Sequence, residues 1–180
     1  IYAPFLFDAT VAEFFPAVTC GAAVRVVPGE IRLEEEELAA FLKEHRISVA
    51  IFVPAIGKAV LRDRSFPHLR LVILAGDKPG TLEPRPFCLV NAYGPTEYTV
   101  CSNAQYISTP TLNPPVGPAV DNTMAIVLDG RGRLFPPGVP GELCLSGVQL
   151  AKGYVNQPAA TARAFVEKPH PGADPRAATM

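Results

Sequence analysis

The sequence has few of the residues that build metal centres, and they are scattered. Its four cysteines, Cys20, Cys88, Cys101 and Cys144, form no C-x-x-C pair, and its three histidines stand far apart. This spacing argues against a zinc site, because such sites draw ligands from closely spaced pairs. We expect the cysteines to be buried, unpaired thiols in a reducing, cytoplasmic environment.

The sequence also lacks a strong net charge and a long hydrophobic run. A net charge of −1 over 180 residues gives no attraction for nucleic acid or for an anionic membrane, so neither is an expected partner. The longest apolar stretch, residues 47–61, is interrupted by Pro54 and Lys58 and is too short to span a bilayer. The first residues show no signal-peptide pattern. A content of 48% hydrophobic and 18% charged residues is typical of a globular protein.

Apolar runs alternate with helical patterns in the first two thirds of the chain. This alternation predicts an α/β class with a parallel sheet flanked by helices, over residues 1–116. The expected strands are residues 22–27, 47–53, 69–75 and 87–90, and the expected helices are residues 8–19, 34–46 and 55–63.

The last third has a different pattern. Residues 124–128 and 142–145 are β-type runs around D-G-R-G at 129–132, a turn sequence of antiparallel hairpins. We expect residues 117–180 to form a β-rich subdomain, with a short helix at 158–165 and a loop from residue 169 onward.

The polar stretch N-A-Y-G-P-T-E at residues 91–97 follows a buried strand. An aromatic ring can stack on adenine, a Gly-Pro turn brings the backbone close to phosphates, and Thr96 and Glu97 offer the hard oxygen ligands that Mg²⁺ prefers. A polar loop with no ligand is the alternative interpretation of these residues alone. Asp8 is open to two interpretations in the same way: a helix N-cap, or a carboxylate that binds a substrate ammonium group.

Three motifs in order resemble the adenylation domains of nonribosomal peptide synthetases, in the adenylate-forming superfamily. They are N-A-Y-G-P-T-E at 91–97, F-D-A-T-V-A-E at 7–13, and G-E-L-C-L-S-G at 141–147 with L-A-K-G-Y at 150–154. The resemblance implies a flavodoxin-like α/β subdomain followed by a barrel-like one. It implies an enzyme that uses ATP and Mg²⁺ to convert an amino acid to an aminoacyl-adenylate, with pyrophosphate as the other product. The acyl group then passes to the phosphopantetheine thiol of a carrier domain, and a condensation domain is a further expected partner.

The resemblance also assigns roles to individual residues. Asp8 would bind the α-ammonium of the substrate, so the resemblance favours this role over the N-cap, and Glu97 would ligate Mg²⁺. The adenosine and α-phosphate contacts would come from Ala75, Gly76, Asn91, Ala92, Tyr93, Gly94 and Thr96. Thr96 and Glu97 are the expected catalytic residues.

By the same resemblance, the wall of the side-chain pocket is apolar. A polar substrate side chain buried there would lose its water without replacement, at a cost of about 2 kcal/mol or more. We therefore expect a bulky apolar substrate, with an aromatic one favoured because Ala12 leaves room in the pocket. Besides Asp8, the wall consists of Ala9, Ala12, Ile51, Ile73, Ala75, Ala92, Val100 and Cys101.

Several parts of the family are missing from the sequence. The phosphate loop expected upstream, the Y-R-T-G-D segment and the C-terminal domain with its catalytic lysine are absent. We expect the chain to be an internal fragment with little activity alone. Three alternatives stay open. One is an acyl- or aryl-acid CoA ligase of the same superfamily, against which Asp8 argues, and another is a nucleotide-binding α/β module without chemistry. The third is a degenerate structural remnant inside a larger synthetase, against which the intact Asp8, Thr96 and Glu97 argue.

Overall fold

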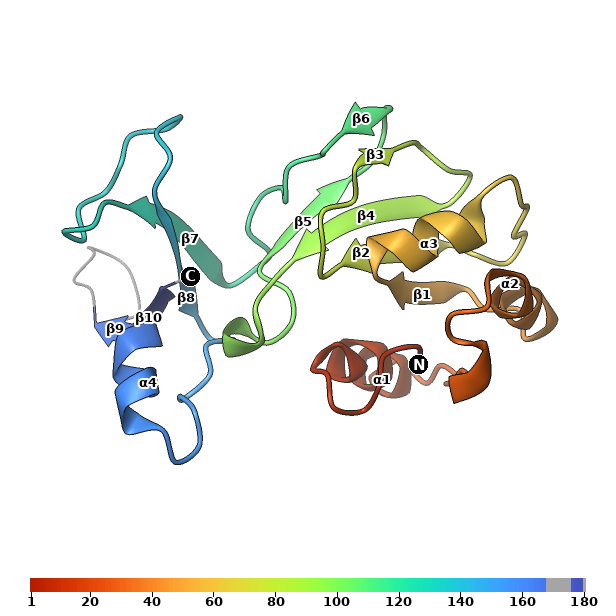
Figure 1. Cartoon of the computed structure of the whole chain (residues 1–180), viewed down its shortest axis with the longest axis horizontal. Helices are drawn as coiled ribbons and strands as arrows, with labels where there is room; N and C mark the ends of the chain where they lie inside the picture. The colour runs from red at the N-terminus through yellow and green to blue at the C-terminus, as the bar shows by residue number, and fades with distance from the viewer. Residues whose placement is uncertain (168–175, 180) are drawn as a thin grey trace. The chain divides into compact units, whose positions relative to one another are not determined.

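The computed structural model describes residues 1–167 and 176–179 (Figure 1). The chain divides into two compact units, which are described separately below. The first consists of residues 1–93 and 104–117, and the second of residues 94–103 and 118–180. Residues 94–103, which follow the strand of the N-A-Y-G-P-T-E motif, group with the second unit. The expected domain limits of 1–116 and 117–180 stay a prediction.

The first unit is built on a four-stranded sheet in the order β1-β2-β4-β5. β1 runs parallel to β2, and β2 runs parallel to β4. The parallel α/β arrangement expected from the alternating pattern is therefore present. A second, two-stranded sheet pairs β3 with β6 antiparallel. The strands are β1 (Val49–Phe52), β2 (Leu71–Ala75), β3 (Thr81–Leu82), β4 (Cys88–Tyr93), β5 (Asn103–Tyr106) and β6 (Thr111–Leu112).

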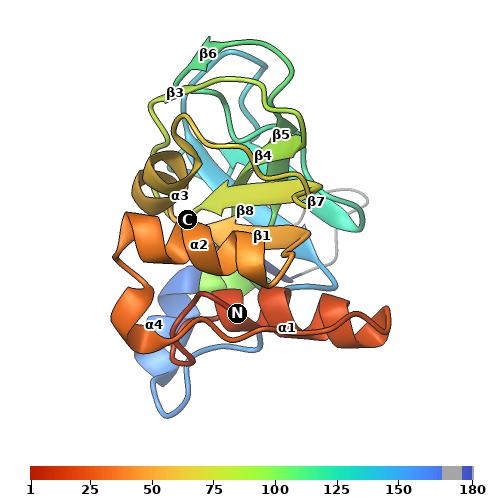
Figure 2. The ribbon, with the colours of Figure 1, turned by 90° about the vertical axis from the view of Figure 1, so that its right-hand side faces the viewer.

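Helix α3 packs directly on one face of this sheet (Figures 1 and 2). The close approach needs Gly57, because a Cβ there would lie 2.4 Å from a methyl carbon of Leu74 and 3.2 Å from Cβ of Phe52. Leu74 and Phe52 belong to the hydrophobic core, which also takes in the buried side chains of α2. The helices of this unit are α1 (Ala9–Thr19), η1 (Gly29–Ile31), α2 (Glu35–Glu44) and α3 (Pro54–Leu61).

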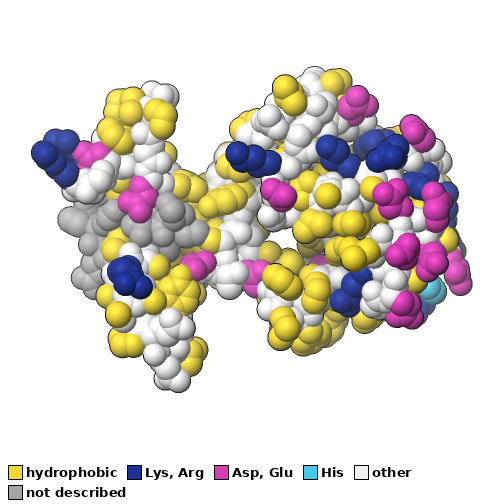
Figure 3. All heavy atoms as spheres, viewed as in Figure 1, with side chains coloured by type: hydrophobic (Ala, Val, Ile, Leu, Met, Phe, Trp, Pro, Cys, Tyr) yellow, Lys and Arg dark blue, Asp and Glu magenta, His cyan; other side chains and the backbone are white. Residues whose placement is uncertain are grey.

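The charged residues at the two ends of α2 match the helix dipole. Its first turn holds Glu35, Glu36 and Glu37, and its last turn holds Lys43. Negative charge near the N-terminus and positive charge near the C-terminus both stabilise a helix. Figure 3 shows acidic side chains gathered over α2, on the surface of the unit. The run of four glutamates from residue 34 is thus a solvated helix start.

The second unit contains an antiparallel sheet in the order β7-β8-β10-β9. Asp129 organises the turn after β7, since its Oδ1 accepts hydrogen bonds from the N–H groups of Arg131 and Arg133. These bonds and the Arg133 guanidinium hold the pKa of Asp129 below its usual range. The elements of the unit are η2 (Thr96–Tyr98), β7 (Thr123–Leu128), β8 (Glu142–Gly147), α4 (Pro158–Ala164), β9 (Phe165–Glu167) and β10 (Arg176–Thr179).

Three expectations are wrong. Residues 22–27 form no strand. A strand needs a neighbouring strand to pair with, and here the N–H of Val27 donates to the carbonyl of Ile1 at 2.9 Å without a continuing series of strand hydrogen bonds. The expected terminal loop contains β10, while residues 168–175 and 180 lie outside the described residues. No disulfide joins the four cysteines, which all lie within the described residues, yet Cys20 and Cys88 are exposed and not buried. Within the described part of the chain, no helix is long and apolar enough to cross a membrane.

Candidate active site

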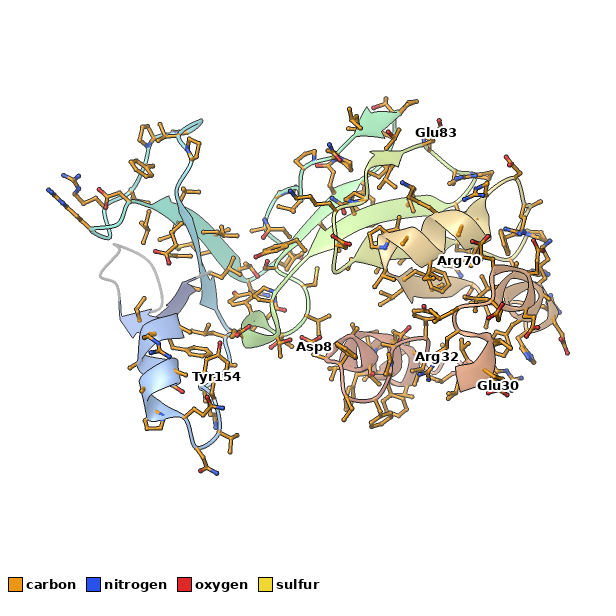
Figure 4. The ribbon with its side chains drawn as sticks, viewed as in Figure 1. Asp8, Glu30, Arg32, Arg70, Glu83 and Tyr154 are labelled. Carbon is orange, nitrogen blue, oxygen red and sulfur yellow. The ribbon has the colours of Figure 1, made fainter. Side chains whose placement is uncertain are left out.

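Asp8 lies at the beginning of α1 (Figure 4), at the position where a side chain can cap the helix. It makes no capping hydrogen bond, so it does not serve as a side-chain N-cap in this structure. Ala9 and Ala12 follow on the same helix and are half-buried. Positions 8 and 12 lie on one side of the helix, because residues four apart are neighbours there. The start of α1 therefore presents a carboxylate beside small apolar side chains.

Glu13 anchors the segment that precedes α1. Its two carboxylate oxygens accept hydrogen bonds from the backbone N–H groups of Tyr2 at 2.8 Å and Ala3 at 2.9 Å. The hydroxyl of Thr10 donates to the carbonyl of Pro4 at 3.1 Å. Hydrogen bonds to a carboxylate are stronger than those between neutral groups. The F-D-A-T-V-A-E motif thus holds the preceding segment against its own helix, a role that the sequence did not reveal.

Four of the predicted pocket residues lie on one face of the sheet. Ile51 is opposite Ile73, and Ala75 is opposite Ala92 in the register of the parallel strands. Residues opposite one another share a face, and so do residues two apart on one strand. α3 packs on Leu74, which points to the other side, so the four residues occupy the face away from α3. The structure thus places Ile51, Ile73, Ala75 and Ala92 on one face of the sheet, and their role as a substrate pocket stays a prediction.

Asn91 is on β4 and is only 3% exposed. Its side-chain nitrogen donates to the carbonyls of Pro114 at 3.3 Å and Pro115 at 3.0 Å. These bonds fix the plane of the amide and make its oxygen the atom that could accept a hydrogen bond from an adenine amine. Asn91 points to the opposite face from Ala92, because the two are neighbours on one strand. Asn91 and the pocket alanine therefore face different surroundings.

The carboxyl ends of two neighbouring parallel strands supply the other adenine residues. β2 ends at Ala75 and β4 ends at Tyr93, whose side chain is half-buried. Gly76 follows β2 with a φ of 92°, a conformation that favours glycine. Ligands of open parallel sheets gather at this edge. Ala75, Gly76 and Tyr93 are thus at the end of the sheet where a nucleotide is expected.

A separate groove of about 300 Å³ lies elsewhere in the first unit. It is lined by Lys58, Arg62, Glu83, Arg85 and several leucines, and by none of the predicted site residues. The groove therefore gives no support to the assigned roles.

In the second unit, residues 94–101 form a tight loop that includes the hydroxyl and carboxylate of the T-E pair. A Cβ on Gly94 would lie 2.3 Å from the carbonyl oxygen of Val100 and 2.6 Å from Cα of Cys101, so only glycine fits. Thr99 and Val100 have φ values of 50° and 71°. This region is unfavourable for β-branched residues, and such strain persists only where the surroundings enforce it. Burial also raises the pKa of the Cys101 thiol.

The loop is joined to the L-A-K-G-Y motif. The backbone N–H of Ala151 donates to the carbonyl of Glu97 at 2.8 Å, and the hydroxyl of Tyr154 donates to the Glu97 carboxylate. The buried Tyr98 hydroxyl donates to the carbonyl of Ser146 at 2.8 Å. The hydrogen bond to Glu97 raises the pKa of Tyr154. The sequence motif includes Tyr154, but nothing in its spacing indicated that it contacts Glu97.

Thr96 and Glu97 fit a magnesium ion that is shared with a nucleotide. Thr96 is exposed and Glu97 is half-buried, so both can reach a ligand. Over residues 1–167, no group of three or more His, Cys, Asp or Glu side chains could hold a metal by itself. Mg²⁺ is commonly bound by one or two carboxylates together with substrate phosphates and water. A single carboxylate with a hydroxyl beside it matches this arrangement.

Comparisons with known proteins agree with the motifs. The profile of the family described as AMP-binding enzyme matches residues 1–155. Bacitracin synthase 1 of Bacillus licheniformis is 37% identical over 170 residues, which are 94% of this chain and 3% of that protein. Novobiocin biosynthesis protein H of Streptomyces niveus is 40% identical over 167 residues, 91% of this chain and 28% of that protein. The chain thus spans a small part of the length of these relatives.

Two solved structures share the fold. The nonribosomal peptide synthetase FmoA3 in its α-methyl-L-serine-AMP bound form matches with a TM-score of 0.84 and 27% identity, over 96% of this chain and 21% of that one. The Vibrio cholerae adenylation domain AlmE in complex with glycyl-adenosine-5'-phosphate matches with a TM-score of 0.79 and 26% identity, over 99% of this chain and 39% of that one. The chain belongs to the family of AMP-binding enzymes, and its motifs and fold are those of the adenylation domains of nonribosomal peptide synthetases.

Proposed function

We propose that the chain is the central part of a domain that activates an amino acid with ATP. A carboxylate oxygen of the amino acid attacks the α-phosphorus, a new P–O bond forms, and pyrophosphate leaves. The aminoacyl group then passes from the adenylate to the phosphopantetheine thiol of a carrier domain in the same synthetase, next to a condensation domain. The aminoacyl-adenylates bound by FmoA3 and AlmE support this reaction type.

Asp8 is the observation on which this proposal rests. An acyl- or aryl-acid substrate has no α-ammonium group, so a ligase for such acids has no use for a carboxylate at this position. The Asp8 carboxylate does not cap α1, and it stands beside Ala9 and Ala12. In our proposal it binds the substrate ammonium with charge-assisted hydrogen bonds.

The first unit supplies the adenine contacts. Tyr93 packs on the adenine ring, and Ala75, Gly76 and Ala92 border it. The buried amide of Asn91, already fixed by two carbonyl acceptors, accepts the exocyclic amine through its oxygen. A fixed amide discriminates well, because a ligand without the matching donor leaves a buried acceptor unpaired.

The second unit supplies the phosphate and metal contacts. Thr96 donates to the α-phosphate, Gly94 allows the loop to close, and Glu97 ligates Mg²⁺. When it is bound, Mg²⁺ neutralises charge on the phosphate oxygens. The loop itself contributes positioning, since hydrogen bonds to the carbonyls of Ser146 and Gln149 and from the N–H of Ala151 hold it in place.

The wall of the pocket selects the amino acid. Ile51, Ile73, Ala75 and Ala92 share one face of the sheet, and no side chain among them is charged. The resemblance adds Val100 and Cys101 to the residues that would contact the substrate, and neither side chain carries a charge in its ordinary state. We propose a bulky apolar substrate such as phenylalanine. The barrel-like subdomain and the cytoplasmic location expected from the sequence stay predictions.

ATP–pyrophosphate exchange with a panel of amino acids tests the proposal in the full-length protein. We expect exchange with aromatic amino acids. Asp8→Asn should raise the KM for the amino acid about ten- to hundredfold and leave the KM for ATP unchanged, since a hydrogen bond to a charged group contributes about 1.5–3 kcal/mol. Asp121→Asn, at an exposed position of the second unit, is the matched control. Exchange only with fatty or aryl acids would identify a CoA ligase instead, and nucleotide binding without exchange would identify a binding module.

A further inference from the structure

Tyr154 contacts Glu97 although the two residues are 57 positions apart. The Tyr154 side chain lies alongside α4 (Figure 4), and its hydroxyl donates to one carboxylate oxygen of Glu97. Both residues belong to the second unit. The resemblance assigns no role to this tyrosine, so the contact needs its own explanation.

The tyrosine is itself held in place by residues of α4 and β9. Its backbone N–H donates to the hydroxyl oxygen of Thr161 at 2.9 Å, and its ring packs edge-on against Phe165 with the centroids 5.6 Å apart. Gly153 makes the approach possible, because a Cβ there would lie 2.5 Å from the methyl carbon of Thr161. The position of the hydroxyl is therefore set by contacts other than Glu97.

The backbone of the Glu97 loop is fixed by separate bonds. The carbonyl of Glu97 accepts from Ala151 at 2.8 Å, and the hydroxyl of Thr99 donates to the carbonyl of Gln149 at 2.6 Å. These bonds hold the loop against residues 149–151 but do not involve the Glu97 side chain. The Tyr154 hydroxyl does contact the carboxylate and therefore restrains its orientation.

We propose that Tyr154 is a positioning residue, whose hydroxyl holds the Glu97 carboxylate in the orientation that ligates Mg²⁺ with ATP. The inference rests on the proposed function, because it takes Glu97 as the metal ligand. The hydroxyl engages one carboxylate oxygen, which would leave the other oxygen to ligate the ion when it is bound. Partners that orient a metal ligand raise its affinity for the metal without touching the ion.

The test is Mn²⁺ binding to the full-length protein in the presence of a non-hydrolysable ATP analogue, followed by electron paramagnetic resonance. Tyr154→Phe removes only the hydroxyl. We expect it to weaken Mn²⁺ binding about tenfold or more, the usual effect of losing such a partner. In ATP–pyrophosphate exchange, the Mg²⁺ concentration for half-maximal rate should rise by a similar factor, with the KM for the amino acid unchanged.

Thr99→Val is the matched control, because it removes a hydroxyl hydrogen bond between the same two segments and does not touch the carboxylate. We expect it to leave Mn²⁺ binding unchanged. Equal weakening in both variants would show that the contact only docks the loop, and unchanged binding in Tyr154→Phe would also overturn the proposal. Thr161→Val removes the hydroxyl that holds the backbone of Tyr154 but leaves the tyrosine hydroxyl intact. It should weaken Mn²⁺ binding to a smaller extent, and it replaces Tyr154→Phe as the test if that variant does not fold. If the wild-type protein binds the ATP analogue but no Mn²⁺, the role of Glu97 as a metal ligand is refuted. That result differs from one in which the wild type binds Mn²⁺ and Tyr154→Phe binds it equally well, which refutes only the role of Tyr154.

Discussion

Tyr98 lies within the loop of the T-E pair, and removal of its hydroxyl group should loosen that loop. The side chain is completely buried, and its hydroxyl donates to the carbonyl of Ser146 at 2.8 Å. Ser146 is itself only 3% exposed, so Tyr98→Phe would leave a buried carbonyl without this donor. The expected loss is about 1–3 kcal/mol, the penalty for an unsatisfied buried polar group. The ring volume is unchanged, so no cavity contributes to this value.

Native-state hydrogen exchange measures the effect where it occurs. Local opening of residues 94–101 controls exchange of the amides in that loop, and a loss of 1–3 kcal/mol should speed it about five- to hundredfold. Tyr106→Phe in the first unit is the control, because it removes the same hydroxyl group from a tyrosine that is 67% exposed to solvent. We expect this variant to exchange like the wild type throughout.

The result that refutes the reasoning is equally specific. If loop exchange in Tyr98→Phe stays within about twofold of the wild type, the hydroxyl contributes less than about 0.5 kcal/mol. The strained backbone after Tyr98 would then be held by the packing of the ring and by the neighbouring backbone bonds. If exchange rises equally in the first unit, the mutation acts on global stability and not on the loop.

Three further predictions use other contacts. Gly94→Ala places a methyl group 2.3 Å from a backbone carbonyl of its own loop and should destabilise the protein by about 1–3 kcal/mol in urea unfolding, whereas Gly130→Ala, which meets open space, should be neutral. Glu13→Gln leaves one acceptor oxygen where two N–H groups now bond to the carboxylate, and should cost about 1–3 kcal/mol in the same assay. Because burial raises the pKa of its thiol, Cys101 should be alkylated more slowly near pH 8 than the exposed Cys88 in a mass-spectrometric time course, and its rate should rise at higher pH. Equal alkylation rates would contradict this.

The sequence predicted the elements whose formation depends on local pattern. The parallel strands around residues 47–53 and 69–75 and the helix around 34–46 follow from apolar runs and charge placement, and all are present. The strand expected at 22–27 fails for a reason that no local pattern contains. Its β-branched residues favour an extended chain, but strand formation needs a partner along its whole length. In this structure the partner is a single residue.

In the candidate site, too, the sequence predicted what depends on local pattern and not what depends on contacts between distant residues. Four pocket residues share one sheet face because the side-chain period of a strand is two, which the sequence already contains. The contact between Tyr154 and Glu97 depends instead on where two distant loops meet. That meeting requires glycine at position 147, where a Cβ would lie 2.5 Å from the Tyr98 hydroxyl, and at position 153, where it would strike Thr161. In the sequence these glycines appear only as letters of one motif. Their purpose is visible only in the folded chain, where Tyr98 lies against position 147 and Thr161 lies against position 153, so replacing either glycine should disturb the contact between Tyr154 and Glu97.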